Sequence, residues 1–161
     1  MAIIFTKGEE LNIDWSVIGA AATAVGTVVT ALGVLFGAWQ IRLSKKQAQA
    51  KFEDQLDQQY RSLTIDLPVD VLIGKKPQEK DQARVRELIY NYLDLTNEQT
   101  YLRAKGRISG HTWISWSSGI AAHLKRPAFE SVYKEIENTS GFTYLERLVK
   151  SNYLSDPISW F

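Results

Sequence analysis

A run of 27 residues without a charged side chain, Trp15 to Ile41, restricts the fold of this sequence more than any other feature. As a helix it would extend roughly 40 Å at 1.5 Å per residue, more than the ~30 Å hydrocarbon core of a bilayer. Trp15 and Trp39 lie near its two ends, where tryptophan rings favour the level of the lipid headgroups. Asp14 is placed to cap the first turn. We therefore predict one transmembrane helix over residues 15–41.

Two other interpretations of this run stay open. A secretory signal peptide has positive charge before an apolar core of about 7–15 residues, whereas here the core is longer and the basic residues follow it. A buried helix of a soluble protein is the second alternative, although such a helix is rarely uncharged on every face over this length.

The charges that flank the run predict its orientation. Four basic residues follow it: Arg42, Lys45, Lys46 and Lys51. Before it, Lys7 is accompanied by three acidic residues. By the positive-inside rule, residues 1–14 form an extracytoplasmic tail and the C-terminal part lies in the cytoplasm. We expect a single-pass protein of the inner (cytoplasmic) membrane with its N-terminus outside.

Small residues recur along the predicted span at alternating spacings of three and four. They are Gly19, Thr23, Gly26, Thr30, Gly33 and Gly37. Such a stripe lets helix backbones approach closely and favours association in lipid, so we predict that these residues form a homo-oligomeric interface. Transmembrane helices are also rich in glycine generally, which is the alternative explanation. Thr23, Thr27 and Thr30 could pair across helices or line a narrow path.

Residues 42–77 are predicted to form a helical stalk and a linker. One apolar face follows helical spacing through Ala48, Phe52, Leu56, Tyr60 and Leu63. A surface helix with a hinge near Ser44 is the alternative. The helix should end before Pro68, and Val69, Val71 and Ile73 alternate as in a short strand or an extended segment.

Residues 78–161 are predicted to form a small cytoplasmic ligand-binding domain built only from helices. A long helix should cover 78–105, with Gly106 as its stop. Thr112 is the expected N-cap of a second helix, Pro127 opens a third, and Phe142 to Val149 belong to a fourth. The fold class is mainly α: one N-terminal transmembrane helix followed by a small all-α cytoplasmic domain.

Catalytic and metal-binding motifs are missing from the sequence. It contains no cysteine and only two histidines, and none of the common nucleophile, zinc or phosphate-loop signatures occurs. We expect no catalytic residue, no metal and no cofactor, and hence not an enzyme; an unrecognised hydrolase is the alternative. His123 is expected near a helix C-terminus, satisfied by the helix dipole.

One group of basic and aromatic residues is a candidate ligand-binding site. It consists of Arg103, Lys105, Arg107, His111, Trp113, Trp116, Lys125 and Arg126. Cations neutralise phosphates and aromatic rings stack on bases, so this set could hold a small nucleotide. The alternative is that the tryptophans belong to the core and the cations to a solvated rim. A formal net charge of +1 argues against binding of duplex nucleic acid.

The stretch from Leu88 to Ile136 resembles a loose bacterial family with one N-terminal span and a helical cytoplasmic domain. The shared pattern is a Tyr-Leu-Asp helix, a turn around Gly-x-Ile, a helix with tryptophan and an Arg-Pro-x-Phe start. It covers about a third of the chain.

The whole layout is also similar to the membrane-bound effector of type III CRISPR systems that binds cyclic tetra-adenylate. That resemblance rests on architecture, so no binding residue is carried over from it. It implies a homotetramer whose cytosolic domain binds the cyclic messenger and perturbs the membrane segment, halting growth of the infected cell.

Two functions are therefore expected. The first is an antiviral defence effector in which a cyclic oligoadenylate bound by the cytoplasmic domain perturbs an oligomeric transmembrane bundle and disrupts the membrane. The second is a non-enzymatic single-span anchor or scaffold that recruits a cytoplasmic protein partner. The partners implied are the lipid bilayer, further copies of the chain and, for the first function, the messenger.

Overall fold

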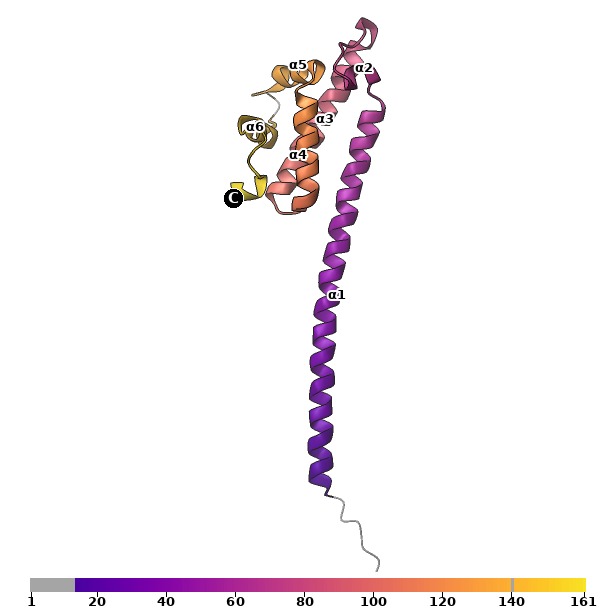
Figure 1. Cartoon of the computed structure of the whole chain (residues 1–161), viewed down its shortest axis with the longest axis vertical. Coiled ribbons are helices and arrows are strands. Elements are labelled where there is room, and N and C mark those ends of the chain that lie inside the picture. The colour runs from indigo at the N-terminus through magenta and orange to yellow at the C-terminus, as the bar shows by residue number, and fades with distance from the viewer. Residues whose placement is uncertain (1–13, 140) are drawn as a thin grey trace, which may run out of the picture. The chain divides into compact units, whose positions relative to one another are not determined.

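The computed structural model describes residues 14–139 and 141–161, and it is 80% helical, with no β-strand in those ranges (Figure 1). This confirms the predicted fold class of one long apolar helix near the N-terminus followed by a helical domain. The chain divides into two compact units, residues 1–45 and 46–161. The predicted extracytoplasmic tail lies outside the described residues, apart from Asp14.

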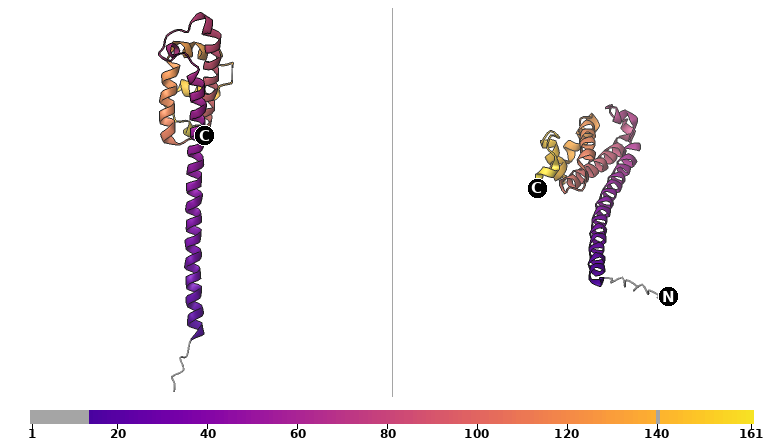
Figure 2. Two further views of the ribbon diagram at one scale, coloured as in Figure 1. Left: turned by 90° about the vertical axis from the view of Figure 1, so that its right-hand side faces the viewer. Right: turned by 60° about the horizontal axis from the view of Figure 1, so that its bottom comes forward.

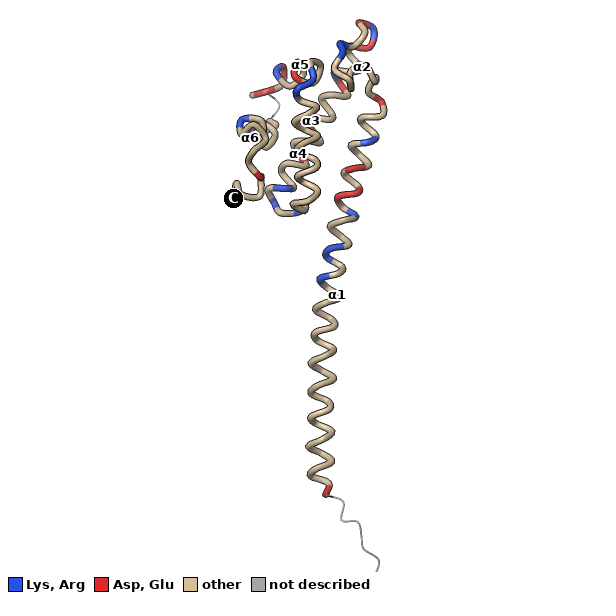
Figure 3. The backbone as a smooth tube through the Cα atoms, viewed as in Figure 1, with Lys and Arg blue, Asp and Glu red and all other residues tan. Residues whose placement is uncertain are grey.

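The first unit contains the apolar part of helix α1 (Trp15–Ile65). Asp14 caps it as predicted, because its Oδ1 accepts a hydrogen bond from the Ser16 backbone N–H at 3.0 Å. Figure 3 shows no charged residue on α1 between Asp14 and Arg42. This segment is exposed throughout except at the half-buried Gly37. By length and composition, α1 contains a segment that could cross a membrane, as could a signal sequence or the core helix of a soluble protein.

The second unit begins with the remainder of α1, which ends at Ile65, three residues before Pro68, as the proline predicts. The expected strand after it is wrong, because Val69–Leu72 is the short helix α2. Val71 is completely buried, whereas Val69 and Ile73 are exposed. In a helix, positions i and i+4 share one face and i+2 lies opposite, so five residues with alternating burial fit a helical turn as well as a strand.

Four longer helices and two short 3₁₀ helices follow in the described part of the chain. The long helix predicted for 78–105 is η1 (Glu79–Asp81) and α3 (Gln82–Ala104), and it stops at Gly106, whose φ is +70°. Helix α5 (Pro127–Ile136) starts with Pro127 in its first turn as predicted. The chain then forms α6 (Thr143–Lys150) and η2 (Pro157–Trp160).

The predicted N-cap of the second domain helix is wrong. Helix α4 covers Gly110–Leu124, and Ser109 caps it, because its hydroxyl accepts a hydrogen bond from the Thr112 backbone N–H at 3.2 Å. Thr112 is therefore the third residue of the first turn. Its hydroxyl is 2.9 Å from that of Ser109.

Helix α3 forms the centre of the second unit, with α5, α6 and η2 packed against it (Figure 2). Ile89 and Leu93 of α3 are completely buried, as are Phe129 of α5 and Leu145 of α6. Two threonines, Thr96 and Thr100, lie in this core, and each hydroxyl donates to the carbonyl four residues earlier at 2.8 Å. The hydroxyls of these two buried threonines are therefore satisfied without water.

Candidate functional site

The structure distributes the eight predicted ligand-binding residues over three places. Lys105, Arg107 and His111 are exposed around the turn that precedes α4. Lys125 and Arg126 follow the other end of that 15-residue helix, roughly 22 Å away at 1.5 Å per residue. The other three, Arg103, Trp113 and Trp116, have structural contacts described below. One chain alone therefore does not bring the predicted residues into a single site.

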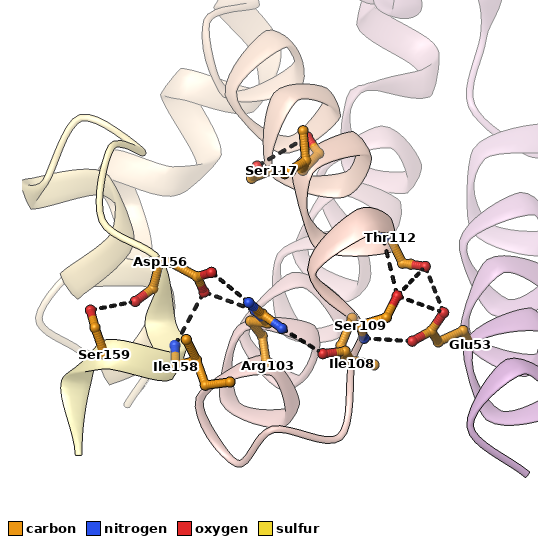
Figure 4. Close-up of polar contacts among 10 residues, drawn as sticks. Glu53, Arg103, Ile108, Ser109, Thr112, Ser117, Asp156, Ile158 and Ser159 are labelled. Atoms are coloured by element: carbon orange, nitrogen blue, oxygen red, sulfur yellow. Dashed lines mark hydrogen bonds and ion pairs between the residues drawn. The ribbon is translucent and has the colours of Figure 1, made fainter. Parts of the chain in front are cut away.

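Arg103 is a structural anchor for the C-terminus (Figure 4). Arg103 is only 7% exposed, and its guanidinium donates two hydrogen bonds to Asp156, from Nε to Oδ1 at 2.8 Å and from Nη2 to Oδ2. Nη1 donates to the Ile108 carbonyl at 2.7 Å. This fork is the strong bidentate geometry of an arginine–carboxylate pair, so Arg103 has no free edge for a ligand.

The two tryptophans of the predicted site differ in their surroundings. Trp113 is 4% exposed and belongs to the hydrophobic core, as the alternative interpretation expected. Trp116 is half-buried, and its indole Nε1 donates to Oδ1 of Asp57 at 2.9 Å. Its ring lines a cavity together with residues of α1 and α3.

The remaining cations contact neighbours within the chain. Lys105 lies over the Phe161 ring, with its Nζ 4.6 Å from the ring centroid, in a cation–π arrangement. Arg126 is half-buried, and its Nη1 is 2.8 Å from Nδ1 of His123. No hydrogen bond or ion pair involves the side chain of Arg107, His111 or Lys125 within residues 14–139 and 141–161.

A line of polar contacts joins the second half of α1 to α4 and the turn before it. We call it the α1–α4 seam; it pairs Gln49 with Arg107, Glu53 with Ser109 and Thr112, Asp57 with Trp116, and Tyr60 with His123. The four α1 residues are spaced by four, four and three, which places them on one helix face. Because partner numbers rise together, these segments run parallel.

Glu53 makes the densest contact of the seam (Figure 4). Its Oε1 accepts the Ser109 backbone N–H at 2.6 Å, and its Oε2 accepts the Thr112 hydroxyl. The carboxylate thus lies at the first turn of α4, where it also complements the positive end of the helix dipole. In the sequence, the one indication of this contact is that Glu53 lies four residues before Asp57, on the same face of the helix.

His123 has a different role from the one that its place near a helix end predicts. It is 7% exposed, and burial, followed by the nearby Arg126 charge, lowers its pKa to about 4. A guanidinium can only donate, so Nδ1 accepts from Arg126 and the proton lies on Nε2, which donates to the Tyr60 hydroxyl at 3.1 Å. His123 is a neutral core residue, and the prediction that the helix dipole satisfies it is wrong.

The predicted oligomerisation stripe is open within a single chain. A Cβ atom built on Gly19, Gly26, Gly33 or Gly37 would meet no atom within 4 Å apart from the excluded local backbone. The hydroxyls of Thr23, Thr27 and Thr30 each donate to the carbonyl four residues earlier, at 2.8 to 2.9 Å. These threonines therefore offer a neighbouring helix their acceptor lone pairs, while their own protons are already used.

A small cavity in the second unit adjoins the seam. Its volume is about 290 Å³, and it is lined by Asp57, Tyr60, Arg61, Tyr92, Gln99, Ser115, Trp116, Gly119 and Ile120. Only Trp116 belongs to the predicted site. The other residues come from α1, α3 and α4 and are separated by long stretches of sequence, so no local motif signals the cavity.

Among the described residues, no three His, Cys, Asp or Glu side chains gather closely enough to hold a metal ion. No protein-family model, curated protein or solved structure matches this chain.

Proposed function

We propose that this protein is a single-span membrane anchor whose cytoplasmic helical domain is a non-enzymatic module that recruits a protein partner. The observation that carries the proposal is the apolar segment of α1, which is 0% buried in the chain. The core helix of a soluble protein would be covered by other elements, and a bilayer supplies the cover that this segment lacks.

The second unit supports the non-enzymatic part of the proposal. The buried side chains of Arg103 and His123 are hydrogen-bonded to other residues of the domain and join different segments of it. The large apolar side chains of Ile65, Val69 and Ile73 are 82%, 70% and 62% exposed near α2. Exposed apolar groups close together in a folded domain favour contact with another protein.

Membrane extraction tests the anchor. We expect the full-length chain expressed in bacteria to stay in the membrane pellet after washing with alkaline carbonate and to dissolve in detergent. A variant with Val25→Arg and Val28→Arg should move to the supernatant, because each arginine at the span centre costs about 3 kcal/mol of insertion. Wild-type protein found in the supernatant without detergent would refute the anchor.

The cyclic-oligoadenylate effector is a second candidate, favoured by the exposed positions of Lys105 and Arg107. In a symmetric oligomer these cations would recur around the axis, where a ring-shaped messenger with repeated phosphates could be held. The resemblance in layout to the CRISPR effector supports the same effector function.

Calorimetry of the detergent-solubilised chain with cyclic oligoadenylates separates the two candidates. If the effector function holds, one messenger binds, binding weakens steeply with salt, and Lys105→Ala with Arg107→Ala reduces affinity by roughly tenfold or more. If calorimetry detects no binding of any cyclic oligoadenylate at any salt concentration, the messenger function is refuted and the anchor function is unaffected.

A further inference from the structure

The cavity beside the α1–α4 seam contains a buried amide without a partner. Gln99 of α3 is 5% exposed and lines the cavity. Within residues 14–139 and 141–161, its side chain makes no hydrogen bond. No fully sealed side-chain polar atom in that part of the chain lacks a partner. The Gln99 amide is therefore reached from the cavity, and a polar occupant there would satisfy it.

Two opposite charges lie on the α1 wall of the same cavity, one helical turn apart. Asp57 uses Oδ1 for the Trp116 indole, and its Oδ2 has no partner in the described part of the chain. The guanidinium of Arg61 is exposed and forms no ion pair there, not even with Asp57. An acceptor for a cation and a donor for an anion are thus both available at the cavity wall.

The remaining lining residues are aromatic or apolar, apart from Ser115. Tyr60, Tyr92 and Trp116 contribute rings, and aromatic faces attract an ammonium group. A volume of about 290 Å³ is at the lower end for ligand sites, which typically span roughly 300–1,000 Å³. The space suits a molecule the size of a free amino acid and is too small for a cyclic oligonucleotide.

We propose that this cavity binds a small zwitterion of amino-acid size. Its carboxylate binds the Arg61 guanidinium, its ammonium binds Oδ2 of Asp57 beside the Trp116 ring, and a polar side chain reaches the Gln99 amide. The proposal goes beyond the anchor function and does not depend on it. It makes the helical domain a sensor of a small metabolite, placed where the occupant contacts α1, α3 and α4 together.

Binding to the full-length chain in detergent micelles tests the proposal. The probes are the twenty standard L-amino acids, measured by ligand-observed NMR and calorimetry, with the N-acetyl and carboxamide derivatives of each hit. We expect one or more polar amino acids to bind, and both derivatives to bind at least roughly tenfold more weakly because each lacks one charge. No binding by any amino acid, or equal binding by the derivatives, would overturn the proposal.

Cavity variants locate the site. Arg61→Gln, on the exposed rim, should weaken binding by roughly tenfold or more. Gly119→Leu should abolish it by filling the cavity, and this change is accommodated because a Cβ on Gly119 meets no atom within 4 Å. Lys51→Gln, which neutralises another exposed cation of α1, is the matched control and should keep wild-type affinity.

Folding and anchoring are checked separately on the same variants. Each should retain the wild-type circular dichroism spectrum and stay in the membrane pellet after carbonate washing. If a hit binds Gly119→Leu as well as wild type, the cavity is not the site and the proposal fails. If amino acids bind but the wild-type chain leaves the membrane, the anchor function fails and the cavity proposal stands.

Discussion

His123 lies among the rings of Tyr60, Tyr92 and Phe129, with its ring centroid 5.1 Å from those of Tyr92 and Phe129. The charged residue that lowers its pKa, Arg126, is also positive, so protonation would place two cations together in an apolar environment. An imidazole in such surroundings is stable only as the neutral form.

This environment makes the domain sensitive to mild acid. The folded state holds the pKa of His123 at about 4, against 6.5 for an unperturbed histidine. Between those values the unfolded chain binds the proton and the folded chain does not. The free energy of unfolding should therefore fall by about 2 kcal/mol from pH 7 to pH 5, and this group should contribute little further loss below about pH 4.

Urea unfolding followed by tryptophan fluorescence at pH 7, 6 and 5 measures this loss. His123→Gln keeps a hydrogen-bonding side chain but cannot titrate, so most of the slope against pH should disappear whatever the variant's stability at pH 7. An identical slope in wild type and variant would show that other groups cause the acid sensitivity.

At the scale of elements, the sequence predicted most helices because their signals are local. Pro68 and Pro127 set a helix end and a helix start, and Gly106 adopts the positive φ that a helix stop favours. The error at Val69 to Ile73 has a physical cause, since alternating burial over so short a segment does not separate a strand from one helical turn. At α4, both Ser109 and Thr112 are good caps, and spacing alone does not choose between them.

The candidate site was less predictable because its partners are distant in sequence. The apolar positions of α1 showed which face is covered, and Glu53, Asp57 and Tyr60 share that side at helical spacing. Nothing in α1 says that Ser109, Trp116 and His123 lie opposite. The same holds for Gln99, whose burial without a partner depends on how three helices leave a gap.

The glycine stripe of α1 leads to a prediction about this element alone. Gly33→Leu adds a bulky side chain at a position where a Cβ meets no atom of the same chain within 4 Å apart from the local backbone, so any change in self-association arises from contacts between chains. We expect self-association in membranes to weaken by roughly tenfold or more, which corresponds to about 1.4 kcal/mol. A transmembrane self-association reporter or fluorescence energy transfer in vesicles measures it.

Ala24→Leu is the matched control, since it adds similar bulk on the other side of the helix and should leave association unchanged. If Gly33→Leu associates as strongly as wild type, the stripe is not the interface. If both variants weaken association equally, added bulk alone causes the effect and the stripe has no special role.

At the scale of the second unit, the Arg103–Asp156 pair holds the C-terminal segment against α3. Asp156→Asn leaves the nearly buried guanidinium without its counter-charge, and we expect a loss of about 1–3 kcal/mol in unfolding free energy, reduced because the Asp156 side chain is 42% exposed. Glu130→Gln removes the surface pair with Lys134 and should cost less than about 0.5 kcal/mol.

Denaturant titration of the two variants compares these pairs under one condition. The pH dependence of stability gives a second check. The hydrogen bond from Arg103 lowers the pKa of Asp156. The pair's contribution to the free energy of unfolding should therefore be complete at neutral pH and decline as the carboxylate is protonated below about pH 4. Equal losses for Asp156→Asn and Glu130→Gln would show that the C-terminal pair is no stronger than a solvent-exposed one.

The regular spacing of the α1–α4 seam also limits how residues 46–65 can slide along their neighbour. A change of register by one residue, 1.5 Å along the axis, would place a face about 100° away opposite α4 and would break the contacts of Gln49, Glu53, Asp57 and Tyr60 at once. A displacement of one full turn, about 5.4 Å, would bring the same face back to α4, but only one of the two former carboxylate positions would again hold a carboxylate. We therefore expect these polar contacts to hold residues 46–65 in a single register against α4.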